Sequence, residues 1–162
     1  MAPDRARSPR PGPRGAPLDP AALVEVSEAI GDLPRRPDLL IEALHAVQDR
    51  FACIRHAHLR ALADLFNLPP VAPFEAATFY AHFDVIADDA PPPPVPTVRV
   101  CDGLPCAMAG AAALRDALRA ALPEARVIAA PCLGACHCAP ACAASHALVE
   151  SASVEAVAHA LR

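Results

Sequence analysis

The chain has 162 residues, of which 54% are hydrophobic and 20% are charged, and its formal net charge is -4. Nucleic-acid-binding domains usually carry a basic surface, so this charge argues against that class of protein. No run approaches the ~18 consecutive apolar residues that a membrane-spanning helix needs. No apolar stretch follows the N-terminal arginines, as it would in a signal peptide. We therefore expect a cytoplasmic protein that neither binds nucleic acid nor inserts into a membrane.

The N-terminal segment, residues 1–20, is rich in proline and arginine and shows no apolar periodicity. Such a segment cannot bury enough surface to offset the entropy that ordering costs. We predict a disordered basic tail over 1–20. The next segment, residues 21–86, carries apolar side chains at helical spacing and short connections, which predict a helical bundle.

Four helices are predicted in this bundle. They cover residues 21–30, a segment from Pro37 to Phe51, a segment around 59–66, and residues 73–83. The boundaries come from Gly31 after the first helix, Pro37 at the start of the second and Pro69-Pro70 after the third. In the fourth helix we assign Phe79 and Phe83 to the core. Tyr80 is assigned to the surface, because its hydroxyl tolerates water.

Residues 87–96, ADDAPPPPVP, form the clearest boundary in the chain. Four consecutive prolines make a stiff, extended spacer. We interpret this segment as a proline-rich linker between the bundle and a second unit over residues 97–162.

The second unit has the order β-α-β-β-α, which predicts a small α/β domain. The expected elements are a strand over 97–100, a helix over 108–122, strands over 126–130 and 147–149, and a helix after Ser153. Ser153 is the expected N-cap of that closing helix, whose apolar face carries Val154, Val157 and Leu161.

Two pairs of cysteines follow the first two strands of this unit. Cys101 and Cys106 form a C-x4-C pair, and Cys132 and Cys136 form a C-x3-C pair. A helical crossover makes the two strands parallel, so both cysteine loops leave the same edge of the sheet. Four thiols that converge in this way suit a soft metal centre, either zinc or an iron–sulfur cluster.

The cysteine spacing favours the iron–sulfur centre. Structural zinc is usually held by C-x2-C to C-x4-C hooks. The wide first hook suits a [2Fe-2S] cluster better, because each iron takes two sulfurs. Gly103 and Gly134 lie inside the hooks, where the backbone must pass close to a ligand. The alternatives are buried cysteines without function and a thiol oxidoreductase working through Cys101 and Cys106, although the C-x-x-C spacing of thioredoxins is absent.

Three further cysteines bring the total to seven, an odd number that disfavours a disulfide framework. Cys53 lies between Phe51 and Ile54 and is expected in the helical core. Cys138 and Cys142 allow other assignments of the metal ligands in the second hook. Cys138 could replace Cys136, or the cysteines at 132, 136, 138 and 142 could form a zinc knot alone. His137 is expected to be a loop side chain near the site, with metal ligation as the alternative.

Two motifs in the chain resemble a known family. The cysteine hooks followed by Ala139-Pro140, and the segment ATFYAHF at 77–83, are similar to the thioredoxin-like [2Fe-2S] ferredoxin subunits of NADH-oxidising complexes. Residues 39–48 are similar to the first long helix of that family. Such subunits occur in respiratory complex I, as the gamma subunit of NAD-dependent formate dehydrogenase, and in NAD-reducing hydrogenases. The likeness covers about residues 20–162.

This resemblance implies a thioredoxin-like domain behind an N-terminal helical bundle. The family's four cluster ligands fall on Cys101, Cys106, Cys132 and Cys136. The resemblance also implies a partner subunit that binds FMN and NAD, together with further iron–sulfur or molybdenum subunits. The chain itself has no G-x-G-x-x-G loop, so the nicotinamide cofactor is expected on the partner. The expected function is one-electron transfer between the cluster and the partner's flavin, and the alternative is a structural zinc module for assembly.

Overall fold

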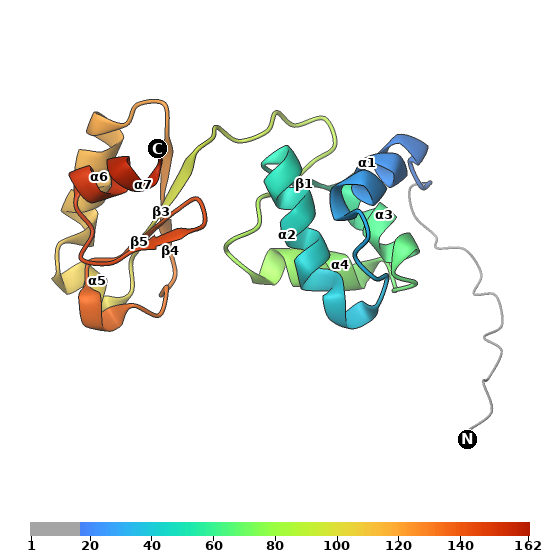
Figure 1. Cartoon of the computed structure of the whole chain (residues 1–162), viewed down its shortest axis with the longest axis horizontal. Coiled ribbons are helices and arrows are strands. Elements are labelled where there is room, and N and C mark those ends of the chain that lie inside the picture. Colours follow the sequence, from blue (N-terminus) through green and yellow to red (C-terminus); the bar gives the residue numbers. More distant parts are fainter. Residues whose placement is uncertain (1–16) are drawn as a thin grey trace, which may run out of the picture.

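The computed structural model describes residues 17–162, and residues 1–16 of the tail predicted over 1–20 lie outside the described residues. Within the described range the chain combines helices with a four-stranded sheet, so the predicted mixed α/β class is confirmed. Figure 1 shows the helices of the N-terminal half on one side of this sheet and α6 and α7 on the other. No helix among residues 17–162 has both the length and the apolar character needed to cross a membrane.

The described part of the N-terminal half contains four α-helices and two very short strands. Its elements are α1 (Pro20–Ile30), η1 (Pro37–Leu39), α2 (Leu40–Phe51), β1 (Ile54–Arg55), α3 (His56–Leu65), α4 (Val71–Phe79) and β2 (Val85–Ile86). Helix α1 begins one residue earlier than predicted. The Asp19 side chain accepts a hydrogen bond from the Ala21 N–H at 3.0 Å, and Pro20 occupies the first helical turn. The helix ends at Gly31, whose φ of 48° suits a residue without a side chain.

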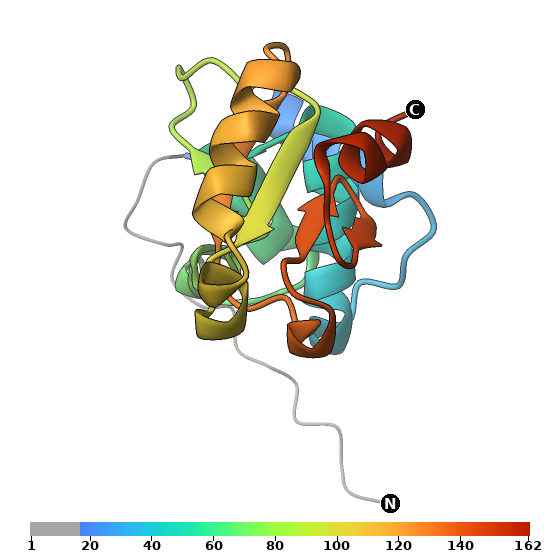
Figure 2. The same cartoon turned by 90° about the vertical axis from the view of Figure 1, so that its left-hand side faces the viewer.

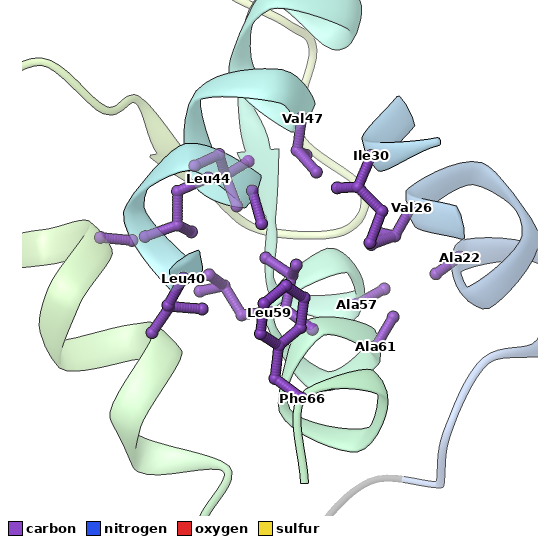
Figure 3. Close-up of a cluster of buried hydrophobic side chains, with 14 of the residues drawn as sticks. Ala22, Val26, Ile30, Leu40, Leu44, Val47, Ala57, Leu59, Ala61 and Phe66 are labelled. Atoms are coloured by element: carbon purple, nitrogen blue, oxygen red, sulfur yellow. The ribbon is translucent and has the colours of Figure 1, made fainter. Parts of the chain in front are cut away.

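The core of this half is built from aliphatic side chains of α1, α2 and α3 around Phe66 (Figure 3). Val26, Leu44 and Leu62 are fully buried there, and Cys53 is buried as predicted. Packing of these helical faces excludes apolar surface from water, which is the main stabilising contribution in such a bundle.

The fourth helix is shorter than predicted, and the prediction for Phe79 is wrong. Helix α4 ends at Phe79 because Tyr80 adopts an extended conformation, with ψ at 123°. Phe83 then returns to the core through a turn and is buried, whereas Phe79 is 79% exposed. Glu75 and Thr78 are the polar residues of α4, and apolar side chains lie on all of its sides, so its sequence does not indicate which side faces the core. Tyr80 is exposed, as expected.

The C-terminal half is built around a sheet with the strand order β4-β3-β5-β6. Its elements are β3 (Thr97–Cys101), α5 (Leu104–Met108), α6 (Ala111–Ala121), β4 (Arg126–Ala130), η2 (Cys136–Cys138), β5 (Cys142–Ala144), β6 (Ala147–Val149) and α7 (Val154–Ala160). Strands β3 and β4 are parallel, as predicted, and β5 is antiparallel to both β3 and β6. The Ser153 side chain caps α7 by accepting from the Ala156 N–H at 3.2 Å.

Two features of this half differ from the sequence prediction. The helix predicted over 108–122 is α6, which begins only after Gly110, and a short helix that the sequence does not predict, α5, ends at Met108; Gly110, in a left-handed conformation with φ at 88°, separates the two. Strand β5 was not predicted. Its residues, Cys-Ala-Ala, have little strand propensity, and the strand forms because β3 and β6 pair with it on both sides.

The two halves are joined across the sheet by the carboxylate of Asp84, which follows α4. Its two oxygens lie 3.0 Å from Arg99 Nη2 on β3 and 2.7 Å from Arg126 Nη1 on β4. The same nitrogen of Arg99 donates to the backbone oxygen of His82 at 2.7 Å. Gln48 on α2 accepts from the Asp84 N–H at 3.1 Å. The negative charge of the Asp84 carboxylate offsets the cost of partly burying the guanidinium groups of Arg99 and Arg126.

The predicted linker is attached to the helical half at its start. Arg55 Nη1 donates to the backbone oxygens of Asp88 at 2.8 Å and Ala90 at 3.0 Å. The Asp88 carboxylate pairs with Arg60 at 2.9 Å. The prolines at 91–94 then carry the chain across to β3 (Figure 1).

Replacement of Asp84 by asparagine is expected to destabilise the protein strongly. The Arg99 side chain is only 8% exposed, so the substitution leaves a buried charge without its anion. We expect the free energy of unfolding to fall by about 3 kcal/mol in urea titrations. The control is Asp116→Asn, which breaks the exposed pair with Arg119 and should cost less than about 0.5 kcal/mol. Equal effects of the two substitutions would contradict the proposed importance of Asp84.

Candidate metal centre

The carboxyl ends of β3 and β4 lie side by side, and each is followed by a pair of cysteines. The strands pair in register, with Cys101 opposite Ala130, so Cys132 begins its loop two residues beyond the partner of Cys101. The Asp102 N–H donates to the backbone oxygen of Ala130 at 2.9 Å, which holds the two loops together where they leave the sheet. Figure 2 shows α5 and η2, which belong to these two loops, next to each other at one end of the sheet.

The four cysteines of these loops form two pairs that differ in exposure. Cys101 at the end of β3 and Cys106 within α5 are buried, whereas Cys132 and Cys136 are exposed. The sulfur atoms of Cys132 and Cys136 are 3.3 Å apart. Cys101 lies close enough to both Cys106 and Cys132 to shift the pKa of each. The sulfurs therefore form a connected row, with one buried end and one exposed end.

The electrostatic environment of the four thiols is uneven. The backbone N–H of Gly134, followed by the Cys136 thiol, lowers the pKa of Cys132. The neighbouring Cys132 raises the pKa of Cys136. Burial, followed by Cys101, raises the pKa of Cys106. Among Cys106, Cys132 and Cys136, Cys132 is thus the one that the protein stabilises as a thiolate.

Two glycines shape the loops around these sulfurs. A Cβ atom at Gly103 would lie 3.4 Å from the Cys101 sulfur and 3.5 Å from the Cβ of Cys132, so a longer side chain would enter the space between the two hooks. Gly134 has φ at 84°, a conformation that most other residues adopt only with strain. This turn returns the chain so that Cys136 faces Cys132.

The row of sulfurs fits a centre larger than one ion. Four thiolates around a single zinc ion lie about 3.8 Å from one another, because each Zn–S bond is about 2.3 Å. Among the described residues, no three of the four cysteine sulfurs lie within 4.8 Å of one another. A [2Fe-2S] cluster takes two sulfurs on each of its two irons, and this requirement matches two pairs better than one compact tetrahedron.

Cys106 lies inside α5, at the third residue of that short helix, and therefore before the helix predicted over 108–122. The helix begins at Leu104 because Pro105 occupies its first turn. The break at Gly110 separates this short helix from the longer one that covers the sheet.

The other cysteines do not join the row. Cys142 is buried on β5, where burial raises its pKa to about 11. Cys138 lies at the far end of η2 from Cys136, and burial followed by Glu150 raises its pKa. His137 is an exposed loop side chain, as predicted, and its Nε2 lies 3.9 Å from a Glu150 oxygen. No spacing in the sequence connects Glu150 with Cys138, because Glu150 lies twelve residues further along the chain and meets Cys138 only through the turn after β6.

The chain also matches a protein family across both of its halves. A family model described as thioredoxin-like [2Fe-2S] ferredoxin matches residues 26–162. The chain belongs to the thioredoxin-like [2Fe-2S] ferredoxin family. For this ferredoxin, family membership indicates electron transfer with an iron–sulfur cluster. A comparison with curated proteins gave no match.

Chemical labelling of the folded, metal-free ferredoxin is expected to separate its thiols by exposure. Iodoacetamide at neutral pH should modify Cys132 fastest, because its pKa is lowered, should modify Cys136 and Cys138 more slowly, and should spare Cys53 and Cys142, which are buried. The raised pKa of Cys142 also keeps that thiol protonated and unreactive at this pH. Mass spectrometry of the peptides measures the labelling. All seven cysteines should react once the chain is unfolded, and equal labelling of Cys142 and Cys132 in the folded chain would contradict the structure.

Proposed function

We propose that this chain is the electron-transfer subunit of a multisubunit NAD(H)-dependent oxidoreductase. In this proposal the chain carries one [2Fe-2S] cluster, held by Cys101, Cys106, Cys132 and Cys136. The observation that carries the proposal is the row of four sulfurs at the ends of β3 and β4, in a member of the [2Fe-2S] ferredoxin family. When bound, the cluster supplies a centre that accepts and releases one electron at a time.

The residues of the chain provide the surroundings of that centre. Cys101 and Cys106 lie in the protein interior, where water is excluded. Cys132 and Cys136 lie at the surface, where a redox partner can approach closely. The N–H of Gly134 acts on the Cys132 sulfur, and hydrogen bonds to sulfur together with burial are the means by which proteins set the potential of such centres.

The proposed partner is a subunit that binds FMN and NAD and exchanges single electrons with this chain. An apolar surface next to the cysteines supports a docking role. Leu104 and Met108, at the two ends of α5, are 74% and 81% exposed, and Cys106 lies between them. Exposed apolar patches of this kind often mark contact sites between proteins. Further iron–sulfur or molybdenum subunits would connect the flavin to the final substrate, which can be a quinone, formate or hydrogen.

We also propose a cytoplasmic location for this complex. All seven cysteines of the chain are unpaired, and clusters of unpaired cysteines are typical of reducing compartments.

The cluster is tested by anaerobic purification of the full chain. We expect about two irons and two acid-labile sulfides per chain, and a brown colour that dithionite bleaches. The substitutions Cys101→Ser and Cys132→Ser should each reduce the iron content and the visible absorption strongly. The matched control is Cys53→Ala, which removes a buried thiol from the helical half and should leave the iron content unchanged.

A colourless protein that contains zinc in place of iron would reject this proposal in favour of a structural zinc module. Iron and sulfide contents that do not change in either serine variant would reject the ligand assignment.

The docking surface is tested by introducing a charge on α5. The double substitution Leu104→Asp and Met108→Asp should reduce co-purification of the flavin subunit by about tenfold or more, because a buried charge opposes contact with an apolar surface. Its iron content should stay normal, because neither residue is a proposed ligand. Leu148→Asp on β6, an exposed leucine outside the cysteine loops, is the control and should retain the partner. Loss of the partner in this control alone would place the docking surface elsewhere.

A further inference from the structure

A second group of metal-binding side chains lies beside the proposed cluster site and does not belong to it. The donor atoms of His137, Cys138 and Glu150 all lie within 4.8 Å of one another. No other group of three or more such side chains is this compact within the described part of the chain. We propose that these three residues form a separate binding site for one zinc ion.

The backbone holds the two segments of this site together. The Ser151 N–H donates to the backbone oxygen of Cys138 at 2.8 Å, and the Ala152 N–H donates to that of Pro140 at 2.7 Å. The Cys138 N–H donates to Ala135 and closes η2, which carries both His137 and Cys138. Glu150 lies in the connection between β6 and α7 and is thereby held opposite η2. The three ligands therefore come from a braced framework and not from one mobile loop.

The chemistry of these donors selects the metal. A thiolate, an imidazole and a carboxylate together suit zinc, whereas magnesium and calcium prefer oxygen ligands alone. Zinc bonds of about 2.0–2.3 Å require neighbouring donors about 3.5 Å apart. The His137 and Glu150 side chains are exposed, so rotation about their side-chain bonds can close the remaining distance. Three protein ligands leave a fourth position open to water.

This zinc site is distinct from the row of cysteines at the sheet edge. Cys136 faces Cys132 at 3.3 Å, while Cys138, at the other end of η2, faces Glu150. A zinc ion on His137 and Cys138 would fix η2 and, with it, the loop that presents Cys136. It would also occupy the half-buried Cys138 thiol and prevent this sulfur from competing for iron.

The proposal is tested with the full chain carrying its cluster. The protein is dialysed against micromolar zinc, and bound zinc and iron are measured by atomic emission. We expect about one zinc per chain, with no loss of iron. Cys138→Ser, His137→Ala and Glu150→Gln should each weaken zinc binding by at least about tenfold, since even outer-shell changes at metal sites cost 10–100-fold.

Two variants serve as controls. His159→Gln removes an exposed histidine at the end of α7 and should leave zinc binding unchanged. Cys138→His keeps a zinc ligand at the same place and should restore binding relative to Cys138→Ser. Zinc X-ray absorption of the wild-type chain should show one sulfur and several nitrogen or oxygen neighbours.

The same measurement is repeated with the double variant Cys101→Ser, Cys132→Ser, in which the sheet-edge cysteines cannot hold a cluster. Zinc binding that persists there and disappears on adding Cys138→Ser supports the site, even if the wild-type chain proves to contain no iron. This experiment therefore tests the zinc-site proposal separately from the cluster proposal. The absence of bound zinc, binding that is unchanged in all three single variants, or a zinc spectrum without sulfur would overturn the proposal.

Discussion

The parallel pairing of β3 with β4 is the constraint on which the site depends. The two strands are adjacent and in register, and both point toward the same edge of the sheet. A side chain that follows one strand therefore meets a side chain that follows the other, although about thirty residues separate Cys101 from Cys132 in the sequence. A slip in this register would move one hook along the sheet edge and separate the two pairs of sulfurs.

The two hooks are held by different means, and this difference explains their exposure. Cys101 is the last residue of a buried strand, and Cys106 lies in a helix, so regular backbone hydrogen bonds fix both. Cys132 lies in a loop and Cys136 begins the short helix η2, and their approach depends on the left-handed turn at Gly134. The protein therefore combines a rigid, buried pair with a surface pair on a loop, an arrangement suited to electron exchange with another molecule.

Much of this arrangement can be predicted from the sequence, because strong local signals and topology agree. The apolar run at 127–130 and the capping serine at 153 predict β4 and α7 correctly. The right-handed crossover rule then places the cysteine loops at one edge without any knowledge of coordinates.

Strand β5 could not be predicted in this way, because its small residues are ordered by their neighbours and carry no strand pattern of their own. The exposure of Phe79 also cannot be predicted, because apolar side chains lie on all sides of α4, on the face with Glu75 and Thr78 as well as on the opposite face. Glu150 meets Cys138 only through tertiary structure, so no spacing rule connects them.

Asp84 has a consequence for how the molecule unfolds. Its carboxylate belongs to the helical half, yet it neutralises arginines on β3 and β4, the two strands that lead into the cysteine hooks. If either half unfolded alone, the Asp84 carboxylate and the two guanidinium groups would lose their partners while still partly buried. This loss raises the free energy of any half-folded form. Asp84 thus links the stability of the two hydrophobic cores, together with the pair of Asp49 on α2 and His146 at 3.0 Å. Heating should melt them together in one cooperative transition, and the helical bundle thereby contributes to the stability of the sheet edge that carries the cysteine hooks.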